Sequence, residues 1–180
     1  MFFESGDEIP TERFIQTRIE AEIAFCMWGP LAGEVTREEV LQATDYVFPS
    51  LEILDTRIFR KDENTGKMRT VFDTISDNAA NAGIISGVQK NDPQKFDLRR
   101  VGSIVMRNNE VEETGLGAGV LNDPITGIIW LVKRLSEYNQ KISPGEIILS
   151  GSFIRPIEAR KGDEFYADFG DFGFVECKFN

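Results

Sequence analysis

An alternation of apolar and acidic residues constrains the fold of this chain more than any other feature. In the stretch Ile19-Glu-Ala-Glu-Ile23, an apolar side chain occupies every second position, and Glu20 and Glu22 lie between them. This period of two is typical of a half-buried β-strand. Residues i and i+2 of a strand point to the same face, so both carboxylates project together from Cα atoms about 7 Å apart.

Two carboxylates on one strand face have two interpretations, of which a solvated outer face is the commoner. The other is a metal site. At ~5 Å and an effective dielectric near 20, two carboxylates repel by roughly 3 kcal/mol, and a divalent cation would turn this penalty into a gain. Glu52 lies in a second strand-like run, Val47–Leu54. Three carboxylates without histidine or thiolate partners suit a hard ion such as Mg²⁺ or Mn²⁺.

Composition narrows the class of protein. A length of 180 residues with 41% hydrophobic content predicts one globular domain over 1–180. Acidic residues outnumber basic ones 30 to 20, and the net charge of −10 opposes nucleic-acid binding. The chain has no histidine, which excludes Ser-His-Asp and Cys-His catalysis and histidine-based zinc sites within it.

The cellular setting follows from two further observations. No apolar run approaches the roughly 18 residues that a membrane span needs, so no membrane partner is expected. Cys26 and Cys177 make one possible pair, too few for a disulfide scaffold. We therefore expect reduced thiols in a cytoplasmic protein.

Turn and capping signals predict a mainly β chain with a few helices. Extended segments are expected over 18–28, 46–58, 97–107, 110–114, 146–150, 164–169 and 173–179. Pro49 suggests a bulge or an edge position, and 108–109 is a plausible hairpin turn. Helices are expected over 36–43, which opens with a capping box, within 71–87, and from 122 to about 138. Residues 1–10 are expected to be irregular.

Several runs of the chain carry a family resemblance. They are Val71-Phe-Asp-Thr-Ile-Ser-Asp-Asn-Ala-Ala-Asn-Ala-Gly83, Glu112-Glu-Thr-Gly115, Gly151-Ser-Phe-Ile-Arg-Pro156, and Ala159-Arg-Lys-Gly-Asp163 with Asp168-Phe-Gly170. Together, and in this order, they resemble the 2-oxohepta-3-ene-1,7-dioate hydratases of the fumarylacetoacetate hydrolase superfamily. The resemblance implies an α+β, mainly β fold: the superfamily's mixed β-roll with a few helices.

The resemblance also implies a function. Its metal ligands map onto Glu20, Glu22 and Glu52, the residues that the strand pattern selects. It implies an Mg²⁺-dependent hydratase, a carbon-oxygen lyase that adds water to 2-hydroxyhepta-2,4-diene-1,7-dioate in the catabolism of aromatic acids. The expected partner is this small 2-oxo dienoate.

One departure from the family concerns the N-terminal part. Family members are longer, and Met1-Phe-Phe-Glu-Ser-Gly6 resembles a segment inside them. The family's Gly-x-Lys-x-Gly motif, whose lysine transfers protons, is not found in this chain. We therefore expect a chain that is truncated relative to the family, with its catalytic residue unknown, and that forms a homo-oligomer or binds a complementing chain.

Four further residues are candidates for substrate binding. Ser76, Asp77 and Asn78 match a family stretch near the active site, although these residue types also favour capped turns. Arg155 could pair with the distal carboxylate of a diacid, or alternatively with a surface acid such as Glu158.

Two functions of different classes remain open. One is the hydratase, with a 2-keto-4-pentenoate hydratase or decarboxylase as its nearest competitor. The other is an inactive or partner-dependent fragment that serves as a binding or assembly subunit. The absent lysine motif favours the fragment, and retention of all three glutamates favours the enzyme.

Overall fold

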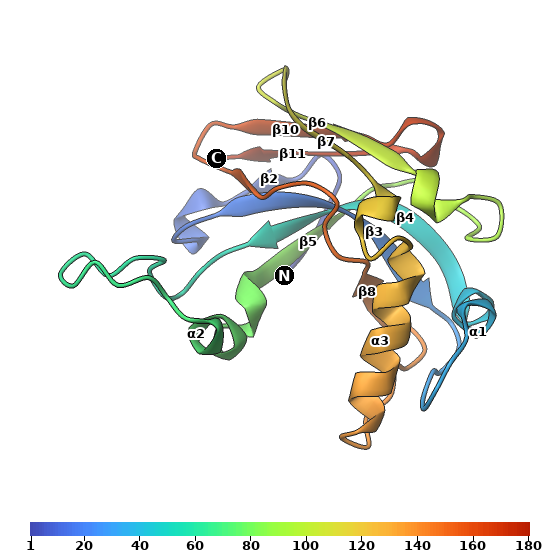
Figure 1. Cartoon of the computed structure of the whole chain (residues 1–180). Helices are drawn as coiled ribbons and strands as arrows, with labels where there is room; N and C mark the ends of the chain where they lie inside the picture. The colour runs from blue at the N-terminus through green and yellow to red at the C-terminus, as the bar shows by residue number, and fades with distance from the viewer.

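Two β-sheets form the centre of the computed structural model, which describes residues 1–180. The first sheet contains, in spatial order, β1 (Phe2–Glu4), β5 (Asn81–Ser86), β4 (Thr44–Leu54), β3 (Arg18–Met27) and β8 (Ile147–Leu149), and β9 (Ile157–Glu158) also pairs with β3. The second contains β2 (Glu8–Ile9), β11 (Phe174–Phe179), β10 (Glu164–Asp168), β6 (Gly102–Arg107) and β7 (Glu110–Leu116). Figure 1 shows the second sheet above the first. The α+β, mainly β fold class is confirmed.

Helices are few and short. The α-helices are α1 (Arg37–Gln42), α2 (Val71–Ser76) and α3 (Pro124–Ser136), and the 3-10 helices are η1 (Thr11–Arg13), η2 (Asn78–Ala80), η3 (Leu98–Arg100), η4 (Gly117–Gly119) and η5 (Gly170–Phe172). None of them has the length and apolar character that crossing a bilayer requires.

The position of the core explains why apolar and acidic residues alternate along the first part of β3. Ile19, Ile23 and Phe25 of β3 are fully buried and belong to one cluster of 31 residues, which also contains Phe165 and Phe179 of the second sheet. These odd-numbered side chains therefore pack between the two sheets. Because side chains alternate along a strand, the even-numbered residues of β3 point to the opposite face of the first sheet.

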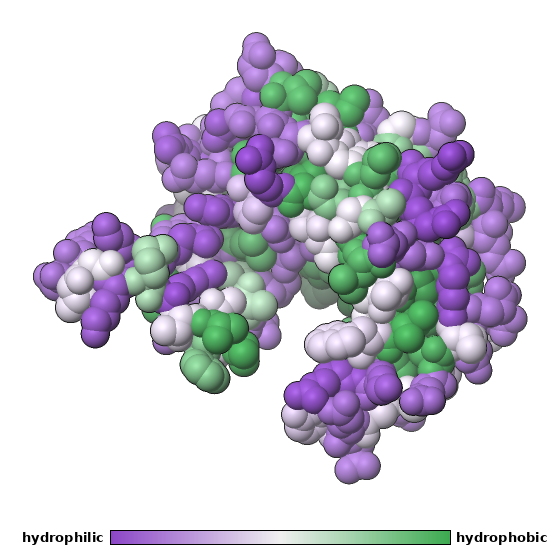
Figure 2. All heavy atoms as spheres, in the orientation of Figure 1, coloured by the Kyte–Doolittle hydropathy of each residue, from purple (hydrophilic) through white to green (hydrophobic).

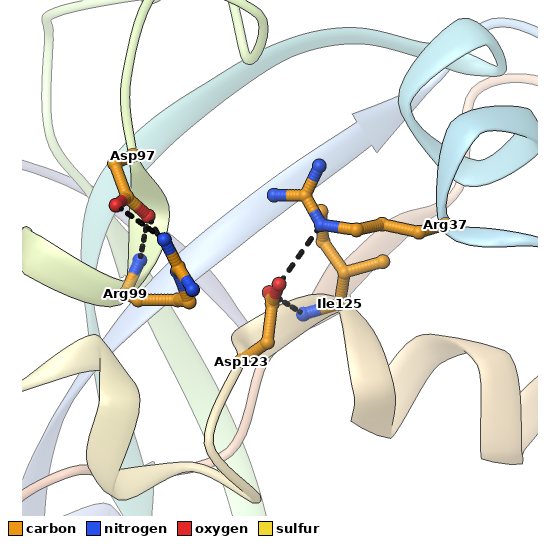
Figure 3. Close-up of polar contacts among 5 residues, drawn as sticks. All are labelled: Arg37, Asp97, Arg99, Asp123 and Ile125. Carbon is orange, nitrogen blue, oxygen red and sulfur yellow. Dashed lines mark hydrogen bonds and ion pairs between the residues drawn. The ribbon is translucent and has the colours of Figure 1, made fainter.

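Capping side chains fix the starts of the helices as the sequence predicts. Thr36 and Glu39 form the reciprocal capping box of α1. Asp123 caps α3 by accepting a hydrogen bond from the backbone N–H of Ile125, and it also accepts one from Nε of Arg37 in α1 (Figure 3). The Asp97–Arg99 pair lies beside them at η3 (Figure 3). These contacts tie α1 to the start of α3.

Two expectations about strands are wrong. Residues 1–10 are not irregular: β1 pairs in parallel with β5, and β2 pairs in parallel with β11. These partners lie more than 80 positions away, and strands of two or three residues are too short to give a local signal. The extended segment expected from 97 begins only at Gly102, because Asp97 caps η3 instead.

Pro49 lies inside β4, which has neighbours on both sides, yet the strand is locally open there. The β4–β5 pairing ends at Ser50, and the Pro49 carbonyl accepts a bond from the N–H of Gly87 beyond the end of β5. The proline therefore occupies the local edge that its missing N–H requires.

Glycines 115 and 117 serve close packing. A Cβ at Gly115 would lie 2.1 Å from the carbonyl oxygen of Phe153, and one at Gly117 would lie 2.1 Å from that of Leu98. Backbone thus approaches backbone at both positions, which only glycine permits.

Candidate metal centre

Three glutamates converge on the face of the first sheet that points away from the second sheet. Glu20 and Glu22 come from β3 and Glu52 from β4, and Glu20 lies directly opposite Glu52 in the antiparallel register. One carboxylate oxygen from each of the three can be chosen so that all lie within 4.8 Å of one another. The strand pattern and the pairing of β3 with β4 therefore build one cluster.

The surroundings of the cluster disfavour negative charge. Glu22 is 2% exposed, and burial first and the Glu52 charge second raise its pKa well above the ordinary value. Burial and then Glu52 also raise the pKa of Glu20, to about 7. Both effects arise because carboxylates that are removed from water and placed beside one another resist ionisation.

Two hydrogen bonds hold the carboxylates in place. The backbone N–H of Gly151 donates to Oε2 of Glu22 at 2.7 Å. Gly151 adopts φ +99°, in the left-handed region that favours glycine. Asn81 donates from Nδ2 to Oε1 of Glu52 at 2.7 Å. Sequence reasoning did not single out Asn81, although it lies in the run 71–83 that carries the family resemblance.

The segment 76–78 lies at the end of α2, and its three residues have different surroundings. Ser76 and Asn78 are exposed. Asp77 is buried and accepts hydrogen bonds from the backbone N–H and Nη1 of Arg57. Arg57 also donates to the carbonyl of Asn81. Asp77 is thus linked through Arg57 to Asn81 and onward to Glu52.

Arg155 is in a different setting. Its side chain is 86% exposed and pairs with Glu113 of β7 at 2.7 Å. Glu158, which the sequence suggested as an alternative partner, pairs with Arg160 instead. The structure therefore does not bring Arg155 into the glutamate cluster.

The cluster fits a hard divalent cation. It offers three carboxylates and no nitrogen or sulfur ligand, the donor set that Mg²⁺ and Mn²⁺ prefer. The pKa values of Glu20 and Glu22 are raised because the site destabilises their negative charges. A bound cation would relieve this destabilisation. A cavity of about 890 Å³ lies elsewhere and includes Ser103, Phe153 and Asp168 in its lining but none of the glutamates.

Comparison with known proteins identifies relatives. No family model matches the chain. It is 50% identical to the 2-oxo-hept-4-ene-1,7-dioate hydratase of Escherichia coli, with 99% of this chain and 67% of that protein aligned. It is 35% identical to the 2-keto-4-pentenoate hydratase of Paraburkholderia xenovorans (strain LB400), with 99% of this chain and 65% of that protein aligned. The chain thus spans about two thirds of the length of these relatives.

Solved structures share the fold. The 4-oxalocrotonate decarboxylase from Pseudomonas putida G7, complexed with magnesium and adipate, matches with a TM-score of 0.90 and 29% identity, over 99% of this chain and 66% of that one. The fumarylacetoacetate hydrolase from Exiguobacterium antarcticum matches with a TM-score of 0.71 and 14% identity, over 99% of this chain and 62% of that one. The mixed sheets therefore have the architecture of fumarylacetoacetate hydrolase-type proteins.

Proposed function

Because the chain belongs to the family of the 2-oxo-hept-4-ene-1,7-dioate and 2-keto-4-pentenoate hydratases, we propose that it contributes to an Mg²⁺- or Mn²⁺-dependent hydratase. The reaction adds water to a conjugated 2-oxo dienoate, with 2-hydroxyhepta-2,4-diene-1,7-dioate as the preferred substrate. Residues 1–180 act as one catalytic-type domain in this proposal. Its cytoplasmic location stays a prediction from the sequence.

The observation that carries this proposal is the convergence of Glu20, Glu22 and Glu52 within 4.8 Å. A chain with no use for a cation gains nothing from holding three carboxylates together on a partly buried sheet face, because their repulsion and desolvation oppose folding. These three residues would hold the metal. When bound, a divalent cation polarises the carbonyl of a 2-oxo acid and stabilises negative charge that develops on its oxygen.

The residues of the chain position these ligands. The Gly151 N–H fixes one carboxylate oxygen of Glu22, and Asn81 fixes one of Glu52. Outer contacts of this kind orient ligands and tune metal affinity. Ser76 and Asn78, exposed beside the Asp77–Arg57–Asn81 connection, remain candidates for hydrogen bonds to the substrate.

Three alternatives make different predictions. A binding or assembly subunit would take up the cation and a 2-oxo acid without turning it over. A 2-keto-4-pentenoate hydratase would turn over a substrate without a distal carboxylate as fast as the dioate. A decarboxylase would release CO₂.

Turnover distinguishes these functions directly. The protein is mixed with 2-hydroxyhepta-2,4-diene-1,7-dioate in the presence and absence of Mg²⁺, and the absorbance of the conjugated diene is followed. Mg²⁺-dependent loss of the absorbance without CO₂ release supports the hydratase. Binding of Mg²⁺ and the diene with no turnover would contradict an active chain and support the binding subunit.

The partner prediction has support from the surface. Val71, Phe72 and Ile75 of α2 are 64%, 75% and 68% exposed. Figure 2 shows hydrophobic atoms gathered on the lobe that carries α2, across a hollow from α3. Apolar groups gathered in this way often mark an interface. Association with a second copy or a complementing chain stays a prediction.

A further inference from the structure

Three arginines beside the metal centre form no direct ion pair, although the charge of Arg18 acts to lower the pKa of Glu20 and that of Arg69 acts to lower the pKa of Asp77. Arg18, Arg60 and Arg69 form no ion pair and donate no side-chain hydrogen bond, whereas Arg57 and Arg155 bind Asp77 and Glu113. All three unpaired side chains are only partly exposed. In a chain with a net charge of −10, such unpaired and partly desolvated cations need an explanation, because buried charges are normally paired.

The three arginines lie together. Arg18 is two residues before Glu20 on β3, so it shares the sheet face of the glutamates. The backbone N–H of Arg69 donates to the carbonyl of Arg60 at 3.0 Å. Burial lowers the pKa of Arg60, and the charges of Arg18 and Arg69 lower it further. Like charges therefore gather beside the carboxylates.

The one acid near Arg60 is already engaged. The charge of Asp55 acts to raise the pKa of Arg60, but its Oδ1 accepts hydrogen bonds from the backbone N–H groups of Ile15 and Gln16 at 2.9 and 2.6 Å. One oxygen of this carboxylate is thereby committed to the segment that leads into β3, and Asp55 forms no ion pair with Arg60.

Unsatisfied buried groups gather at the same end of β3 and β4. Four buried side-chain polar atoms have no hydrogen-bond partner, and three of them are Nε2 of Gln16, Oγ1 of Thr56 and Nη1 of Arg69. Arg18 pairs with Leu54 in the register, so Gln16 and Thr56 continue the two chains just beyond this pair. Buried donors of this kind are rare, and each calls for an acceptor.

From this cluster we infer that Arg18, Arg60 and Arg69 form an anion site that receives the distal carboxylate of a dicarboxylic 2-oxo acid whose other end lies at the glutamates. The inference rests on the proposed function and adds the residues that select a dioate over a pentenoate. Arginine suits this role because its planar donors bind a carboxylate through two hydrogen bonds.

The spacing matches a seven-carbon chain. Its terminal carboxyl carbons are separated by six bonds, the number in two residues of extended backbone, and hence by about 7 Å. Arg18 and Glu20 are two strand residues apart, which is the same span. A substrate with one carboxylate at the metal centre therefore reaches the arginines, whereas a five-carbon pentenoate has no distal carboxylate to place there.

Calorimetric titration in Mg²⁺ with two unreactive keto acids tests the inference. 2-Oxoheptanedioate and 2-oxoheptanoate differ only in the distal carboxylate. The wild type is expected to bind the dioate at least about tenfold more tightly, the effect of one hydrogen bond to a charged group. Arg60→Gln and Arg69→Gln are expected to bring the ratio of the two affinities (dioate over 2-oxoheptanoate) close to one, while the affinity for 2-oxoheptanoate is unchanged. Arg155→Gln is the control and keeps the ratio.

Each other outcome is decisive. Equal binding of both acids by the wild type overturns the arginine site and leaves the metal centre intact. Loss of the ratio in Arg155→Gln but not in Arg60→Gln or Arg69→Gln also overturns it. If neither acid binds in Mg²⁺, both this inference and the proposed function are overturned. Two separate arginine variants, with melting curves for each, ensure that one misfolded variant does not decide the result.

Discussion

Glu20 and Glu52 lie directly opposite each other on the antiparallel strands β3 and β4. Like charges in this arrangement destabilise a sheet, and burial adds to the cost by raising the pKa of Glu20 to about 7. The Glu20–Glu52 pair therefore lowers the stability of the metal-free fold, as expected of residues placed to bind a ligand.

Removing one charge should stabilise the metal-free protein and weaken metal binding. Glu20→Gln is expected to raise the free energy of unfolding without metal by up to about 1 kcal/mol above neutral pH, and to lower the affinity for Mg²⁺. Urea unfolding with and without Mg²⁺ measures both effects. Glu176→Gln, on an exposed position of β11 opposite Tyr166, should change neither.

Stability without metal should fall as the pH rises. The pKa of Glu20 is about 7 in the folded protein and 4.5 as its ordinary value. Between these values the folded state binds more protons than the unfolded state, so the stability contribution present at low pH is lost as the pH rises through 7. Mg²⁺ requires the ionised carboxylates, so its stabilising effect should grow over the same range. Urea unfolding across this range, with and without Mg²⁺, measures both trends, and a metal-free stability that rises with pH contradicts the account.

The Asn81 side chain should tune metal affinity without acting as a ligand. Asn81→Ala removes the 2.7 Å bond to Glu52 and is expected to weaken Mg²⁺ binding by about 10- to 100-fold, as other outer contacts of metal sites do. Calorimetric titration with Mg²⁺ measures the change. Asn64→Ala, in an exposed turn, is the matched control, and equal affinities of the two variants would remove Asn81 from the site.

The exposed face of α2 should drive association. Phe72→Ser removes the most exposed of its apolar side chains and is expected to lower the association constant measured by sedimentation and to reduce binding of a hydrophobic dye. A wild-type protein that is a monodisperse monomer and binds no dye contradicts this prediction.

The sequence predicted the parts of the fold that depend on local patterns. The alternation around Glu20 and Glu22 predicted β3, and the capping box at Thr36 predicted α1. Asn108 and Asn109 predicted the turn between β6 and β7, and both residues have positive φ there. Each of these signals lies within a few neighbouring residues. The same alternation placed two of the three candidate ligands on one face.

Features that depend on contacts between distant segments could not be predicted. The pairing of Glu20 with Glu52 depends on the β3–β4 register, and the bond between Gly151 and Glu22 joins positions 129 residues apart. The unpaired state of Arg69 is likewise visible only when every nearby acid has been placed. Arg155 drew attention by its motif, but the structure gives it a surface partner.

A melting curve with and without millimolar Mg²⁺, for the wild type and Glu22→Gln, tests the central claim most directly. A ligand at ~100 times its dissociation constant that binds only the folded state adds about 2.7 kcal/mol, which for a domain of this size raises the melting temperature by about 5 to 10 °C. We predict this rise for the wild type and its loss in Glu22→Gln. No rise, or the same rise in both proteins, would contradict the three-glutamate metal centre.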